Sequence, residues 1–248
     1  MSSRIEYIQP ALLNGHGISS WFTLRNHQNV NQNSNIPGLN LGLNTIEPIE
    51  VVEHNRNLLL KRLKIEQHEL AYAKQIHKTN IETVDTGGEY PDTDGLVTNE
   101  RNLVLAIQVA DCAAILLGDR KNHVIGAAHA GWRGAVDDIC IKVIMRMKEL
   151  GAESKQIKAF ISPCISLKNF EVGEEVAIQF PSRYIDLTSY EKPHVDLNTF
   201  IKDQLMEQGI AEENIELSGK CTIDNEYFYS YRRQKNKSGR MMAMIKLN

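Results

Sequence analysis

Apolar residues at positions 135–150 recur with the spacing of one helix face. The positions i, i+3, i+4, i+7, i+8, i+11 and i+14 are occupied by Val136, Ile139, Cys140, Val143, Ile144, Met147 and Leu150. This stripe predicts an amphipathic helix, and Gly151 is expected to end it. Residues 124–128 form a short apolar run of strand length just upstream. The sequence therefore predicts that a strand passes into a helix at residues 129–134.

Strand-like and helix-like patterns alternate through the rest of the chain. Further β-like runs lie at residues 71–76, 81–84, 103–109, 113–117, 157–161, 215–217 and 241–247. Helical patterns lie at residues 49–63, 172–180 and 197–208, and residues 26–44, rich in Asn and Gly, are predicted to be a loop. We expect an α/β fold, a layered sandwich with a mixed central sheet and flanking helices. Because no proline-rich or charged linker divides the chain, residues 1–248 are interpreted as one domain.

Composition narrows the class of protein. Of the 248 residues 42% are hydrophobic, which is enough for a sizeable core. The formal charge of -3 argues against nucleic-acid binding, which normally needs a strongly basic face. The N-terminal residues lack an apolar signal core, and the most apolar stretch, residues 103–117, is interrupted by Gln108 and Asp111. We therefore expect a cytoplasmic protein with no membrane partner, and the oligomeric state stays open.

The four cysteines are widely spaced, and no C-x-x-C pair occurs among them. This spacing indicates reduced thiols, not a disulfide framework or a zinc ribbon. Cys140 lies on the helical stripe and Cys221 in a predicted loop, so both are assigned structural roles. Cys164 follows the strand predicted at residues 157–161, where it would either line a pocket or be buried as a small apolar side chain.

Three residues with metal-ligand chemistry lie beside the ends of predicted strands: His77, Cys112 and His129. Neighbouring strand ends converge in space even when the residues are far apart in the sequence. A thiolate with two imidazoles suits zinc, and three protein ligands would leave the fourth tetrahedral position open. Taken singly, a cysteine in an apolar run is usually core packing and a histidine is usually a hydrogen-bonding residue. The residues alone leave both interpretations open.

Ten short motifs, in order along nearly the whole chain, give the sequence a family resemblance. They are Leu-Asn-Leu-Gly at 39–42, Asn-Arg at 55–56, Gln-Ile-His at 75–77, Asp-Gly-Leu-Val-Thr at 94–98, Ala-Asp-Cys at 110–112, Ala-His-Ala-Gly-Trp-Arg-Gly at 128–134, Phe-Glu-Val-Gly at 170–173, Cys-Thr at 221–222, Tyr-Ser-Tyr-Arg-Arg at 229–233 and Gly-Arg-Met at 239–241. With these motifs the chain resembles the YfiH-type, laccase-domain proteins, described as zinc-dependent purine nucleoside phosphorylases and formerly as polyphenol oxidases. The resemblance implies His77, Cys112 and His129 as the zinc ligands and catalytic centre.

The resemblance also implies a reaction. The expected activity is cleavage of adenosine, inosine, guanosine or methylthioadenosine by phosphate, which releases the free base and a pentose 1-phosphate. Deamination of adenosine is a second possible activity, for which zinc with an open position would activate water. Deamination also needs a group that transfers protons. Asp111, next to Cys112, is the candidate, although adjacent residues of a strand point to opposite faces and Asp111 can equally be structural.

Arginines are the expected phosphate contacts, because a guanidinium grips phosphate with paired donors. Arg133 lies in the predicted turn before a helix, whose free N–H groups also favour anions. An ion pair with Asp137 or Asp138 is an equally good interpretation of this residue. Arg56, on the expected polar face of the helix at 49–63, and the pair Arg232 and Arg233 are further candidates.

Two other functions are weighed against the phosphorylase. Copper-dependent oxidation of phenols is suggested by the older family name, but multicopper sites need more histidine ligands than three, and the eight histidines contain no H-x-H pair. Copper therefore ranks below zinc. A non-catalytic binding or regulatory protein that zinc merely stabilises is the third possibility, and an open coordination position argues against it.

Overall fold

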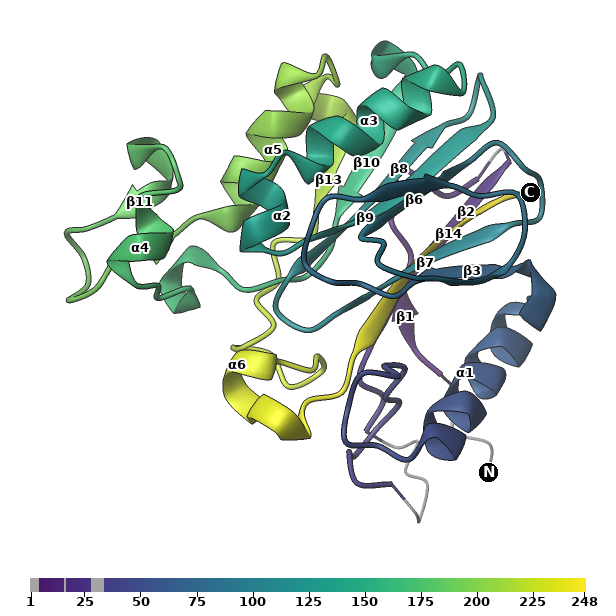
Figure 1. Cartoon of the computed structure of the whole chain (residues 1–248), viewed down its shortest axis with the longest axis horizontal. Coiled ribbons are helices and arrows are strands. Elements are labelled where there is room, and N and C mark those ends of the chain that lie inside the picture. Colours follow the sequence, from purple (N-terminus) through teal and green to yellow (C-terminus); the bar gives the residue numbers. More distant parts are fainter. Residues whose placement is uncertain (1–4, 16, 28–33) are drawn as a thin grey trace.

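Two six-stranded sheets form the centre of the protein (Figure 1), and the computed structural model describes residues 5–15, 17–27 and 34–248. Sheet A has the order β1 (Tyr7–Ile8), β2 (Ile18–Thr23), β14 (Met241–Leu247), β7 (Val104–Val109), β3 (Leu70–Ala73), β5 (Gly88–Tyr90). Sheet B has the order β13 (Ile215–Leu217), β10 (Ile157–Ile161), β8 (Ala113–Asp119), β9 (Val124–Ala130), β6 (Gly95–Thr98), β4 (Ile81–Thr83). Each sheet combines parallel and antiparallel pairs, and β11 (Ile185–Asp186) with β12 (His194–Val195) forms a separate ribbon.

The longer helices cover the outer faces of the two sheets, whereas the short helices α4 and α6 lie to the side of them (Figure 1). They are α1 (Ile49–Leu63), α2 (Trp132–Val136), α3 (Ile139–Glu149), α4 (Glu174–Ala177), α5 (Leu197–Glu207) and α6 (Tyr231–Gln234). Short 3-10 helices lie at Gln67–Glu69, Ser154–Gln156, Leu167–Asn169, Ser182–Tyr184, Glu212–Asn214 and Lys235–Lys237. Helix α1 packs on sheet A, while α3 and α5 pack on sheet B. The α/β layered sandwich predicted from the sequence is confirmed, with two mixed sheets at its centre.

The alternation of side chains along the central strands explains why their sequences are apolar throughout. In β7, Leu105 and Ile107 face the core between the sheets, whereas Val104 faces the layer under α1. In β8, Leu116 faces the core between the sheets and Ile115 faces α3 and α5. A strand that is buried on both faces needs apolar residues at every position. These strands therefore appear in the sequence as continuous apolar runs.

The predicted helix at 135–150 is wrong in one respect, because two helices occupy this region. Helix α2 begins at Trp132, and the chain breaks before α3 at Asp138, whose φ of 67° is left-handed and incompatible with a continuing helix. Gly151 has a φ of 97° and follows the last turn, as predicted. The break turns α2 away from α3 and leaves it directly after strand β9.

Other differences concern short elements. The pattern at residues 172–180 gives only the single turn α4, and His129 lies inside β9, not after it. Strands β2 and β6 are not among the predicted elements. In β2 two serines interrupt the apolar alternation, and Ser20 is nevertheless buried and hydrogen-bonded to Asn14.

The predicted loop at 26–44 contains no helix or strand in its described part, and residues 28–33 lie outside the described residues. No helix of the described chain is both long enough and apolar enough to cross a membrane.

Candidate metal centre

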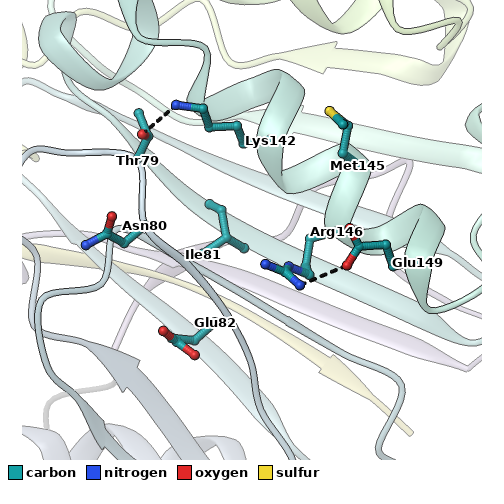
Figure 2. Close-up of a pocket in the computed structure, with 8 residues that line it drawn as sticks. All are labelled: Thr79, Asn80, Ile81, Glu82, Lys142, Met145, Arg146 and Glu149. Carbon is teal, nitrogen blue, oxygen red and sulfur yellow. Dashed lines mark hydrogen bonds and ion pairs between the residues drawn. The ribbon is translucent and has the colours of Figure 1, made fainter.

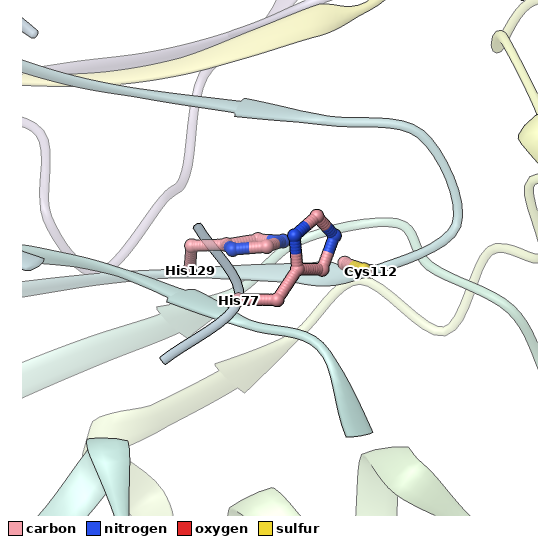
Figure 3. Close-up of side chains that lie close together, drawn as sticks. All are labelled: His77, Cys112 and His129. Atoms are coloured by element: carbon pink, nitrogen blue, oxygen red, sulfur yellow. The ribbon is translucent and has the colours of Figure 1, made fainter. Parts of the chain in front are cut away.

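Three side chains from both sheets meet at the ends of their strands. His77 follows β3 of sheet A, Cys112 directly precedes β8 of sheet B, and His129 is the penultimate residue of the neighbouring strand β9. One ligand atom from each residue lies within 4.8 Å of the other two, and Figure 3 shows the imidazole rings and the sulfur converging. The structure therefore brings together all three predicted metal ligands.

The cluster is open on one side. The side chain of His129 is 3% exposed, Cys112 is partly exposed, and His77 is exposed. The two imidazole rings meet edge to face, with centroids 4.8 Å apart and planes at 82°. A small molecule can approach from the side of His77, while His129 is held in the protein interior.

Asp94, which directly precedes β6, holds both histidines in place. Its buried carboxylate accepts hydrogen bonds from the backbone N–H groups of Ile76 (3.2 Å), His77 (3.0 Å) and Lys78 (2.8 Å). The same carboxylate accepts the Nδ1–H of His129 at 2.8 Å, and the Asp94 carbonyl accepts the His129 backbone N–H at 2.7 Å. These bonds also stabilise the left-handed backbone of His77, whose φ is 59°. One acidic residue thus fixes two of the three candidate ligands.

The hydrogen bond from His129 determines which of its nitrogens can bind a metal. Because Nδ1 donates to Asp94, Nε2 is the nitrogen that a metal can bind once it displaces the Nε2 proton, and carboxylate–histidine pairs of this kind orient metal ligands in proteins. Gly131 lies against the ligand atoms: a Cβ at this position would stand 3.0 Å from the sulfur of Cys112 and 3.7 Å from Nε2 of His129. The missing side chain keeps that space free. The donors and the space fit a tetrahedral divalent ion such as zinc.

The charges of the cluster favour the ligand form of the cysteine. Burial raises the pKa of Cys112, but the charge of His129 and hydrogen bonds from both histidines outweigh it, and the pKa falls to about 6. Burial lowers the pKa of His129, but Cys112 and Asp94 outweigh it and raise the pKa to about 9. The thiolate, which is the metal-binding form, is therefore the prevailing state of Cys112 at neutral pH.

Asp111 lies in the turn between β7 and β8 and not within a strand. Its φ of 81° is left-handed, and its carboxylate accepts the hydroxyl of Thr222 and the backbone N–H of Arg232, each at 2.6 Å. Both oxygens are thus engaged with the segment at residues 222–232. Asp111 ties the turn that carries Cys112 to that segment.

Two of the predicted phosphate-binding arginines, Arg56 and Arg133, have different surroundings. Arg56 is only 7% exposed and not on a solvated helix face: its Nε donates to the carbonyl of Leu41 (2.9 Å) and its guanidinium stacks on Tyr72. Arg133 is exposed within α2 and stacks on Trp132 at 4.3 Å. In the described part of the chain it forms no ion pair with the aspartates that follow.

The other two predicted arginines, Arg232 and Arg233, donate to backbone carbonyls. Arg232 donates through Nη1 to the carbonyl of Glu171 at 2.9 Å. Arg233 donates to three backbone carbonyls, those of Thr222, Ile223 and Phe228. Three carbonyl acceptors use most of the donors of a guanidinium. Arg233 therefore stabilises its own loop, and Arg232 retains free donors.

Cys164 is fully buried in the layer between sheet B and the helices. Its sulfur donates to the side-chain oxygen of Asn198 at 3.2 Å, and burial raises the pKa of the thiol. Cys140 has no exposed surface either, and burial raises its pKa as well. Neither thiol belongs to the metal-ligand cluster of the described residues.

Two surface hollows lie outside the candidate metal centre. A groove of about 430 Å³ runs between β4 and α3, where Figure 2 shows Lys142 bonded to Thr79 and Arg146 to Glu149. A second hollow of about 400 Å³ is lined by seven residues, Lys168, Asn169, Glu171, His194, Ile223, Arg232 and Arg233. Neither lining includes a candidate metal ligand.

The chain matches a known family over most of its length. Residues 19–248 match the family described as multi-copper polyphenol oxidoreductase laccase, and the chain belongs to this family. A protein of Deinococcus radiodurans named purine nucleoside phosphorylase is 36% identical over 213 residues, which cover 85% of this chain and 82% of that protein.

Two solved structures share the fold. The hypothetical protein YfiH of Bacillus licheniformis superposes with a TM-score of 0.84 at 28% identity, over 95% of this chain and 98% of that one. YlmD from Geobacillus stearothermophilus superposes with a TM-score of 0.89 at 23% identity, over 99% of both chains. The family resemblance predicted from the ten motifs is confirmed.

Proposed function

We propose that this protein is a zinc-dependent purine nucleoside phosphorylase. It would cleave adenosine, inosine, guanosine or methylthioadenosine with phosphate to the free base and a pentose 1-phosphate. The observation that carries the proposal is the open cluster of His77, Cys112 and His129, with ligand atoms within 4.8 Å, in a chain whose relatives bear this name. The same proposal places the protein in the cytoplasm, since thiol ligands persist in a reducing compartment. It also takes residues 1–248 as one domain.

Each residue of the centre has a defined part in this proposal. His77, Cys112 and His129 would hold the zinc, which supplies a positive charge that orients and polarises a bound substrate oxygen. Asp94 would orient both histidines through its four hydrogen bonds. Asp111 would keep the turn of Cys112 in place through its bonds to Thr222 and Arg232. The chemistry then rests on positioning and on charge stabilisation, the main needs of phosphorolysis.

The alternatives receive less support from the same residues. Deamination of adenosine needs a carboxylate that is free to transfer protons, whereas both oxygens of Asp111 accept short hydrogen bonds. Oxidation by several copper ions needs several histidine clusters, and the described residues contain one group of three possible ligands. A purely structural zinc would be enclosed, whereas His77 is exposed.

One set of incubations tests the proposal. Protein purified without added metal is analysed for its elements and then incubated with adenosine, inosine, guanosine and methylthioadenosine, each with and without phosphate. We expect about one zinc per chain, and release of purine bases only when phosphate is present. Release of inosine from adenosine without phosphate would indicate deamination instead. Absence of any product from metal-replete protein would refute the proposal, as would copper as the bound metal.

A further inference from the structure

Arg240 lies beside the turn that carries Cys112, although its position in the sequence is remote. It directly precedes β14, and the next residue, Met241, pairs with Val109 at the end of β7. Arg240 is therefore alongside the turn at residues 110–112. Its backbone N–H donates to the side-chain oxygen of Asn40 at 2.9 Å, which fixes the chain at this point.

The side chain of Arg240 is held in one orientation. Its Nη1 donates to the carbonyls of Ser238 (2.9 Å) and Gly239 (3.0 Å), and its Cβ and Cγ lie against Gly42 so closely that any side chain there would overlap them. The guanidinium lies 5.7 Å from the ring centre of Tyr231. An arginine held in this way loses little further freedom when it binds a ligand.

The guanidinium of Arg240 is a half-buried cation without a carboxylate partner. Within residues 5–15, 17–27 and 34–248 it forms no ion pair, and its Nε and Nη2 have no hydrogen-bond acceptor. The pairing of Met241 with Val109 places this cation next to the turn of Cys112. Burial lowers the pKa of Arg240, while the negative charges of Cys112, Tyr231 and Asp111 raise it. A cation that is partly removed from water is stabilised by an anionic partner. The missing partner is expected to be an anion that enters from solvent.

We infer that Arg240 binds the phosphate that attacks the nucleoside at the centre of His77, Cys112 and His129. This inference rests on the proposed function and extends it to a residue outside the predicted candidates. The free Nε and Nη2 of the guanidinium form the planar fork that matches two phosphate oxygens. Arg233 uses its donors on three backbone carbonyls, and Arg56, which is 7% exposed, lies stacked on Tyr72 with its Nε on the carbonyl of Leu41, so neither is as accessible to phosphate from solvent as Arg240.

The reaction that Arg240 would assist is balanced without a further reactant. An oxygen of hydrogen phosphate forms a bond to the anomeric carbon while the bond from that carbon to the purine nitrogen breaks. The electron pair of the broken bond stays on the purine, and the proton lost by hydrogen phosphate ends on the released base. Arg240 keeps its own protons and holds the phosphate in line with the anomeric carbon.

Binding of inorganic phosphate tests the inference independently of catalysis. Isothermal titration of the zinc-loaded protein with phosphate is compared among the parent, Arg240→Gln, Arg240→Lys, Arg133→Gln and the surface control Arg146→Gln. We expect a phosphate Kd about 10- to 100-fold higher in Arg240→Gln, because two charged hydrogen bonds are lost. The phosphate Kd of Arg240→Lys should lie between those of the parent and Arg240→Gln, since lysine keeps the charge but lacks the two-pronged guanidinium. Arg133→Gln and Arg146→Gln should have the phosphate Kd of the parent.

The kinetic constants and the folding of each variant complete the test. In Arg240→Gln the KM for phosphate should rise about as much as the Kd, while the KM for inosine, the zinc content and the melting temperature stay close to those of the parent. Unchanged phosphate affinity in Arg240→Gln would overturn the inference, as would loss of affinity in Arg133→Gln instead, or loss of zinc in both Arg240 variants. Phosphate binding that depends on Arg240 in a parent without phosphorylase activity would refute the proposed function and leave the Arg240 anion site standing.

Discussion

Cys112 and Cys140 place the same functional group in two opposite environments. Cys112 lies in the turn before β8, next to two imidazoles, where its pKa is about 6 and its thiolate is the prevailing form. Cys140 lies on the buried face of α3 among apolar side chains, where burial raises the thiol pKa. The two cysteines differ in their neighbours and in their exposure, because Cys112 is partly exposed and Cys140 is buried. Partners at the strand ends make one thiol a metal ligand, whereas the apolar layer keeps the other inert.

Matched serine substitutions at these two cysteines should have the largest effects, and the two effects should differ in kind. Cys112→Ser removes the thiolate, and we expect zinc loss and a fall in kcat/KM of about 100-fold or more. Cys140→Ser places a hydroxyl in an apolar layer, so it should keep zinc and activity while the free energy of unfolding falls by about 1 to 3 kcal/mol. Elemental analysis, initial rates and urea unfolding measure the three quantities. Equal zinc loss in both variants would show that the two thiols are not functionally distinct.

Asp94→Asn tests whether the cluster depends on its supporting carboxylate. Asparagine keeps the size but removes the charge, and its amide nitrogen cannot accept the two N–H bonds now made to the carboxylate oxygen that it replaces. We expect zinc affinity to fall by about 10- to 100-fold, measured by competition with a chelator. The control Asp186→Asn changes a partly exposed aspartate whose carboxylate accepts bonds only from Thr188 and Ser189 of its own turn. If Asp94→Asn binds zinc as tightly as the parent, Asp94 does not support the metal ligands.

The sequence predicts the fully buried strands better than the breaks between helices and the strands that contain polar residues. Strands buried on both faces, such as β7 and β8, appear as continuous apolar runs and are found from pattern alone. The break between α2 and α3 leaves no signal in the apolar stripe, because Val136 and Ile139 keep the helical spacing across it. Strand β2 is missed because two serines interrupt its apolar pattern, and the burial of Ser20 goes with hydrogen bonds to Asn14, six residues earlier, which the pattern does not indicate.

In the candidate site, too, residues with recognisable chemistry are predicted from the sequence, whereas residues whose role depends on long-range contacts are not. His77, Cys112 and His129 carry recognisable ligand chemistry and stand at predicted strand ends. Asp94 lies in a resemblance motif, but its role depends on a contact to His129, 35 positions away, which no local pattern indicates. Arg240 acquires its place beside Cys112 only through the pairing of β14 with β7. Residues that position others are thus harder to predict than residues that act directly.

In metal-free protein, the pH dependence of alkylation should distinguish Cys112 from the buried cysteines. The pKa of Cys112 lies below its usual value, so its thiolate forms as pH rises through about 6 and is lost as pH falls below it. Iodoacetamide should therefore modify Cys112 about tenfold faster at about pH 7 than at about pH 5, because only the thiolate reacts. Cys140 and Cys164, whose pKa values burial raises, should stay unmodified in the folded protein, and peptide mass spectrometry assigns each site.

Two controls make this measurement decisive. Saturation with zinc should protect Cys112, because the metal occupies the sulfur lone pair that attacks the reagent. Asp94→Asn should shift the rise in Cys112 reactivity toward higher pH, since Asp94 supports the positive charge of His129 that stabilises the thiolate. If the reactivity of Cys112 rises only near the pKa of an ordinary cysteine, about 8.5, the imidazoles do not set its charge. The contrast with Cys140 would then be one of exposure alone.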